Sequence, residues 1–230
     1  MKKTDILVGI LVVLFLLPFI LFDAVFDGYK SINEMHPYLM AFAKFAILAT
    51  FGEMLAMRIK SGKYYSNGFG AFSKMIVWGL FGVWIAFGMK VFATGVPMVV
   101  EKIGVEGLVA AMGEGFSGWK LLGAFCISTM MNTCFAPVFM TVHKITDTHI
   151  MQYGGKAKCL ITPIDAKGII PKLNWDVQWN FVFKKTIPFF WIPAHTLTFI
   201  LPADYQVLFA ALLSIALGLI LAFASLKSAK

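Results

Sequence analysis

Charge is scarce in this sequence. Charged residues make up 14% of its 230 residues, hydrophobic residues make up 59%, and the mean hydropathy is +0.79. Soluble domains carry roughly 25% charged and about 45–50% apolar residues. A water-soluble fold of this composition would expose larger apolar patches than soluble monomers tolerate. The shortage of charge therefore excludes an ordinary soluble domain and predicts an all-α membrane protein, a bundle of helices that crosses the lipid bilayer.

Cysteine and catalytic motifs are also scarce. Cys126, Cys134 and Cys159 are the only cysteines, and no C-x-x-C or zinc-type spacing relates them. They are interpreted as two packing residues and one loop thiol. The sequence contains no Gly-rich phosphate loop and no G-x-S-x-G motif. We therefore predict a protein that is not an enzyme and that has no cofactor and no metal.

Arginine is almost absent, since Arg58 is the only arginine among 20 basic residues, although the net charge is +8. A strongly basic chain can indicate a nucleic-acid partner. Here the lysines stand between apolar runs, where they orient helices in a membrane. No nucleic-acid partner is predicted.

Six apolar runs follow one another along the chain, and about 20 helical residues span the ~30 Å hydrocarbon core. They cover residues 6–22, 38–57, 72–94, 119–142, 180–201 and 205–225. The connecting segments alternate between basic and acidic, and basic segments stay cytoplasmic. We predict one transmembrane domain over 1–230, with six spans and both termini cytoplasmic. The first run is interpreted as an uncleaved helix, not a signal peptide.

Small residues recur at every fourth position in two of the runs. In lipid, such residues let helices approach closely. The last run has Ala210, Ser214, Gly218 and Ala222, which we interpret as a helix-packing seam. The fourth run has Ala124, Ser128, Asn132 and Ala136, which form either a second seam or the wall of a cavity.

Ionisable residues inside the apolar runs are costly and usually face the bundle interior or an aqueous cavity. Lys44 and Lys90 lie near the outer ends of their runs. They could extend their ammonium groups to the interface, or line the mouth of a pore and favour anions. Glu53 lies one turn before Arg58 and could pair with a basic group there.

The fifth run contains Pro188, Pro193 and His195. Proline removes a backbone donor, so two prolines should kink or break this helix. Irregular backbone at membrane depth is tolerated where it is buried in protein or lines a cavity. We favour a cavity wall at this position.

A polar group lies where the fourth run ends, at the start of the predicted loop 143–177. His143, Asp147 and His149 have spacings that could present metal ligands, but no H-x-x-x-H pair is present. Interfacial polar residues are the preferred interpretation. An intramembrane enzyme using these three residues is a third hypothesis, and another version of it uses Glu53 with His195.

Three segments resemble the Mpv-seventeen / peroxisomal-membrane-protein-twenty-two family. His36-Pro37 followed by Gly52-Glu53 resembles its His-Pro and Gly-Asp pattern. Residues 132–137 resemble its Asp-Gln-x-x-x-x-Pro segment, with Asn132 at the Gln position. Residues 191–202 resemble its Trp-Pro, Gln, Asn-Phe and Val-Pro signature, with His195 near the Gln and Thr198 near the Asn. The resemblance covers 36–225 and leaves 1–30 as an extra N-terminal helix.

The chain departs from this family at several positions. Glu53 replaces an Asp, Met57 replaces a Gln, Met131 replaces the Asp before Asn132, and the Trp-Pro motif is stretched by one residue. The resemblance therefore implies a divergent member. Family members lie in peroxisomal, mitochondrial inner or other organelle membranes. Some are described as poorly selective pores for small solutes.

These observations together favour a channel or transporter-like protein that passes small hydrophilic solutes, with anions as a preferred class. The alternative is a non-conducting scaffold that organises lipids or an assembly. The predicted partners are the lipid bilayer and small solutes, and a homo-oligomer is needed if the passage lies between protomers. The location is the cytoplasmic (inner) membrane of a prokaryote or an organelle membrane of a eukaryote. The candidate pore or cavity lining is Lys44, Glu53, Lys90, Ser128, Asn132, Pro188, Pro193, His195 and Thr198.

Overall fold

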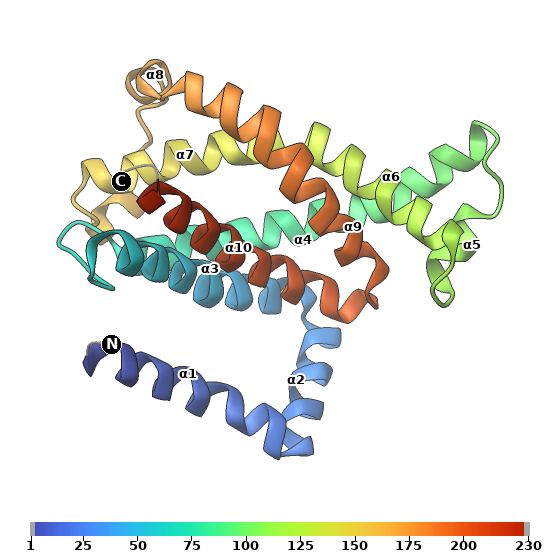
Figure 1. The fold of residues 1–230 in the computed structure, drawn as a ribbon, viewed down its shortest axis with the longest axis horizontal. Coiled ribbons are helices and arrows are strands. Elements are labelled where there is room, and N and C mark those ends of the chain that lie inside the picture. Colours follow the sequence, from blue (N-terminus) through green and yellow to red (C-terminus); the bar gives the residue numbers. More distant parts are fainter. Residues whose placement is uncertain (1–2, 228–230) are drawn as a thin grey trace. The chain divides into compact units, whose positions relative to one another are not determined.

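The structure is a computed structural model that describes residues 3–227 (Figure 1). Every regular element in this range is helical and none of it is strand, which confirms the all-α prediction. The chain divides into two compact units, with the boundary between Met40 and Ala41.

The first unit contains two helices, α1 (Lys3–Leu21) and α2 (Asp23–Met35). The extended backbone of Phe22 ends α1, and Asp23 opens α2, where a carboxylate stabilises the positive end of the helix dipole. The rings of Phe19 and Tyr29 then meet edge to face at 5.9 Å. The predicted single helix over 1–30 is therefore two helices joined at Phe22.

The second unit begins with long helices and continues through short ones. Its first part consists of α3 (Pro37–Ser61), which crosses the boundary between the units, and then α4 (Ala71–Lys102), α5 (Leu108–Gly113), α6 (Gly118–Cys134) and α7 (Ala136–Gln152). Its second part consists of η1 (Ala157–Leu160), α8 (Ala166–Ile169), η2 (Ile170–Lys172), η3 (Val177–Trp191), α9 (Ile192–Ile200) and α10 (Ala203–Lys227).

Several helices have the length and composition of membrane spans. Within the described residues, α1, α3, α4 and α10 qualify singly, and α6 with α7 qualifies as a bent pair, which gives up to five. The helices are thus compatible with a membrane protein, as composition predicted. The predicted run 180–201 corresponds to η3 and α9, which are outside these five.

The fourth predicted run, 119–142, is bent instead of straight. α6 and α7 meet at an angle of 46°, next to Pro137 in the first turn of α7. Proline lacks a backbone donor and its ring clashes with the preceding turn, so the helix changes direction there. α7 then continues to Gln152, so the group His143, Asp147 and His149 is helical and does not open a loop.

The proline-rich fifth run stays helical, and its winding changes. η3 is a π-helix, and it passes into α9 at Trp191 and Ile192. Pro188 lies inside η3, whereas Pro193 lies in the first turn of α9, where a missing donor is tolerated. π-helical turns are rare and often accompany functional sites. The predicted break is therefore a π-to-α transition.

The connecting segments of the second unit gather at two ends. The turn after α3 and the segment around α8 lie at one end, and α5 lies at the other (Figure 1). Ser73 Oγ donates to the carbonyl of Gly155 at 3.2 Å, which joins the two segments at the first end. The two most basic connecting segments therefore lie at the same end. This placement agrees with the alternation seen in the sequence.

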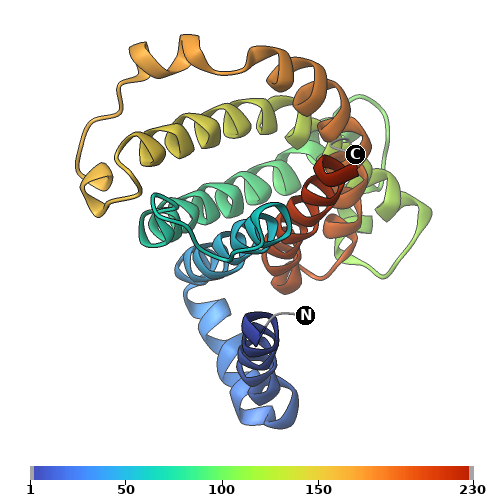
Figure 2. The same cartoon turned by 60° about the vertical axis from the view of Figure 1, so that its left-hand side comes forward.

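α3, α4 and α7 run side by side (Figure 2), and the core between helices is aromatic. Phe45, Trp78, Phe81 and Phe139 belong to one buried cluster. α10 packs on α3 through small residues. A Cβ on Gly52 would lie 3.0 Å from the Cα of Ile215, so the two backbones can come this close only at a glycine.

Candidate functional site

A cavity of about 200 Å³ lies inside the second unit. Its wall comes from α3, α4, α6, α7, η3, α9 and α10, and most of the wall is apolar. Phe45, Phe135 and Phe139 are among its aromatic residues. Among the residues that the structure describes, Glu53 is the only Asp, Glu, Lys or Arg that lines it. The polar lining falls into two groups, one around Asn132 and one around Glu53.

The first group joins α6 to α9. Ser128 Oγ donates to the carbonyl of Ile192 at 2.7 Å. Asn132 Nδ2 donates to the carbonyl of Ser128 at 2.9 Å and lies 3.0 Å from His195 Nδ1. Because the Ser128 carbonyl only accepts, the Asn132 atom facing it must be the NH₂ nitrogen. The same nitrogen then donates to His195, so a neutral His195 carries its proton on Nε2.

Two buried polar atoms in this group lack a hydrogen-bond partner among the described residues. They are Asn132 Oδ1 and Trp191 Nε1. Asn132 is 0% exposed and Trp191 is 7% exposed, and both line the cavity. The Trp191 and His195 rings are 5.0 Å apart, so the three side chains are contiguous. Native proteins leave few such atoms unsatisfied.

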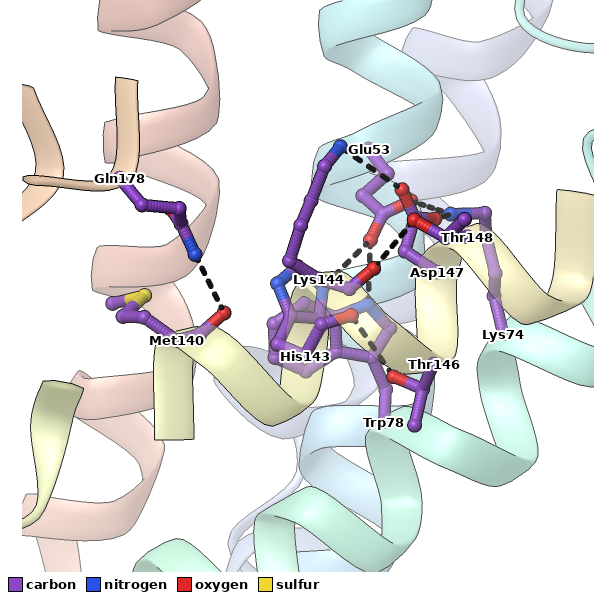
Figure 3. Close-up of polar contacts among 10 residues, drawn as sticks. All are labelled: Glu53, Lys74, Trp78, Met140, His143, Lys144, Thr146, Asp147, Thr148 and Gln178. Carbon is purple, nitrogen blue, oxygen red and sulfur yellow. Dashed lines mark hydrogen bonds and ion pairs between the residues drawn. The ribbon is translucent and has the colours of Figure 1, made fainter. Parts of the chain in front are cut away.

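The second group is a charge cluster formed by Glu53, Lys74, Trp78, His143 and Asp147 (Figure 3). The Lys74 ammonium is 2.6 Å from Glu53 Oε2 and also forms an ion pair with Asp147. Trp78 Nε1 donates to Glu53 Oε1 at 2.7 Å. His143 Nε2 lies 3.7 Å from the same oxygen. The cluster ties α3, α4 and α7 together beside the cavity.

The structure brings some of the predicted lining residues to the cavity and leaves others away from it. Glu53, Asn132 and His195 line it, and so do Ala210, Ser214 and Gly218 of the predicted seam. The remaining predicted residues do not line it: Lys44, Lys90, Ser128, Pro188, Pro193, Thr198 and Ala222. Ser128 still bonds to Asn132 and to α9, and Thr198 Oγ1 donates to its own helix at the Ala194 carbonyl.

Neither of the lysines predicted at a pore mouth lines the cavity. Lys44 is buried at 7% exposure, so its ammonium does not extend freely to the surface. Lys90 is exposed on α4. Neither can set the charge of the cavity wall.

The sequence analysis did not select Lys74, Trp78 or Trp191 as site residues, although Trp191 begins the segment 191–202 that carries the family resemblance. Lys74 and Trp78 are four residues apart, as are His143 and Asp147, so each pair shares one helix face. That spacing was the available signal for the charge cluster. The ion pair predicted for Glu53 near Arg58 is made with Lys74.

The three polar residues His143, Asp147 and His149 of α7 do not all contact the same neighbours. His143 and Asp147 face the charge cluster, whereas His149 Nε2 contacts the Cys159 carbonyl at 3.0 Å. Across residues 3–227, no three His, Cys, Asp or Glu side chains converge as a metal site would require. The three therefore act as separate polar contacts in this structure.

Comparisons with protein families, with curated proteins and with solved structures find no match to this chain.

Proposed function

We propose that this chain is an integral membrane protein that lets small uncharged solutes pass through the cavity of its second unit. The observation that carries the proposal is the cavity itself. It lies among long apolar helices and has hydrogen-bonding side chains in two groups, around Asn132 and around Glu53. Ligand sites are typically concave, mainly apolar and equipped with a few oriented polar groups.

The proposal includes six crossings with both termini cytoplasmic. η3 and α9 together supply residues 177–200, which is long enough for a crossing in addition to the five candidates above. The resemblance to the Mpv-seventeen / peroxisomal-membrane-protein-twenty-two family stays a prediction, and it is consistent with a small-solute pore. The membrane would be the inner membrane of a prokaryote or an organelle membrane.

The proposal does not extend to a preference for anions. That preference depended on Lys44 and Lys90, and neither lines the cavity. Among the described residues of the wall, the charged side chain is Glu53, a carboxylate paired with Lys74, so the wall offers no cation to an anion. Uncharged solutes with hydrogen-bonding groups fit this lining better.

Solute flux into proteoliposomes tests the proposal. Vesicles with the purified protein should take up glycerol faster than protein-free vesicles, as followed by stopped-flow light scattering. Ser214→Leu places extra side-chain volume in the cavity and should lower the rate. Leu212→Phe is the matched control, because Leu212 is exposed on the same helix and does not line the cavity. Wild-type rates equal to those of empty vesicles, with folded protein, would contradict the proposal.

A second candidate is the non-conducting scaffold, and α1 favours it. None of the described residues of α1 is buried, although the helix is long and apolar enough to span a membrane. A long apolar helix of this kind can contact lipid or a partner protein. Specific crosslinks from α1 to a partner, in a protein that conducts nothing, would support this candidate.

A further inference from the structure

The unsatisfied polar atoms beside Asn132 define what a ligand of the cavity must offer. Trp191 Nε1–H is a buried donor and Asn132 Oδ1 is a buried acceptor, and neither has a hydrogen-bond partner among the described residues. A hydroxyl group has two lone pairs and one hydrogen. It can therefore accept from Trp191 and donate to Asn132.

We propose that the cavity binds small neutral alcohols, in which one hydroxyl group is attached to a compact apolar body. A carboxylate could not donate to Asn132 Oδ1, and no lysine or arginine among the described residues of the wall would balance its charge. An ammonium could not accept from Trp191. Glu53 would attract an ammonium, but its carboxylate is already paired with Lys74 and Trp78.

The volume and the lining of the cavity determine which apolar body the alcohol can carry. An apolar cavity of about 150 Å³ holds benzene. The present cavity of about 200 Å³ therefore has room for one ring with a short substituent. Phe45, Phe135 and Phe139 offer the ring aromatic neighbours, and Trp78 closes the wall near Glu53. Benzyl alcohol has the required ring and hydroxyl group.

Equilibrium dialysis in detergent tests this inference with three probes of similar size. Radiolabelled benzyl alcohol, toluene and benzoate are each measured against protein-free micelles, which corrects for partitioning into detergent. Benzyl alcohol should bind saturably with a Kd about tenfold lower than that of toluene, because one well-satisfied polar group contributes about that much. Benzoate should show no saturable binding.

Two substitutions locate the hydroxyl group. Asn132→Leu and Trp191→Phe should each remove most of the preference for benzyl alcohol over toluene. Trp179→Phe is the matched control, because Trp179 is exposed on η3 and does not line the cavity. If Asn132→Leu does not fold, the preference measured for Trp191→Phe alone tests the inference.

Equal wild-type Kd values for benzyl alcohol and toluene would overturn the inference, and so would an unchanged preference in Trp191→Phe. The inference rests on the cavity of the proposed function but concerns binding alone. Selective binding without glycerol flux would retain it and contradict the transport proposal. Glycerol flux without selective binding would support the transport proposal and contradict the binding inference.

Discussion

The ammonium of Lys74 lies 2.6 Å from the carboxylate of Glu53, and this ion pair joins α4 to α3. The side chains are 8% and 24% exposed. Lys74 also pairs with Asp147 on α7, so one buried cation holds two carboxylates from two other helices. Removing it leaves both negative charges without their main partner.

Lys74→Met should therefore destabilise the protein strongly. Loss of one partner of a buried ion pair typically costs about 3–5 kcal/mol, because the remaining charge is uncompensated. The measurement is the free energy of unfolding in detergent. Lys90→Met is the matched control, since Lys90 is an exposed lysine of the same helix, and it should change little. Adding Glu53→Gln to Lys74→Met should recover part of the loss, and a lack of recovery would contradict this account.

Gly82→Ala should destabilise the contact between α3 and α4. A Cβ at Gly82 would lie 2.5 Å from the carbonyl oxygen of Ala41, which is backbone and cannot rotate away. Overpacking of this kind costs about 1–3 kcal/mol. Gly95→Ala is the control on the same helix, because no atom lies within 4 Å of its new Cβ. It should stabilise the helix by about 0.5–1 kcal/mol. Thermal unfolding of both variants measures the difference, and similar melting temperatures would argue against the close approach.

The connecting segments should be reachable from opposite sides of the membrane. Ser66→Cys lies in the segment between α3 and α4, and Glu106→Cys lies between α4 and α5. With the three native cysteines replaced by Ala, an impermeant maleimide applied outside intact cells should label Glu106→Cys and leave Ser66→Cys unlabelled. Labelling after lysis controls for reactivity. Labelling of both in intact cells would contradict the predicted topology.

Much of the fold was predictable because lipid imposes a simple rule on the sequence. Runs of about 20 apolar residues become helices, since every backbone polar group must be satisfied within the segment. The type of helix was harder to predict from the sequence. The prolines of the fifth run predicted a break, whereas the chain keeps its hydrogen bonds by widening to a π-helix before Pro193.

The candidate site was predicted in part. Asn132 and His195 were selected as polar residues within apolar runs, and they lie 3.0 Å apart in the structure. Lys74 lies inside the predicted run 72–94 and was not selected as a site residue. Its ion pairs depend on Asp147, which is 73 positions away in the chain, and such partners follow from tertiary packing alone.

The bend between α6 and α7 has a geometric consequence for the cavity. Asn132 precedes the bend and His143 follows it, and both line the cavity. A different bend angle would therefore change the separation of these two side chains. Pro137 keeps the bend in place because it cannot restore the missing backbone hydrogen bond. This proline therefore sets the distance over which a bound molecule could touch both polar groups at once.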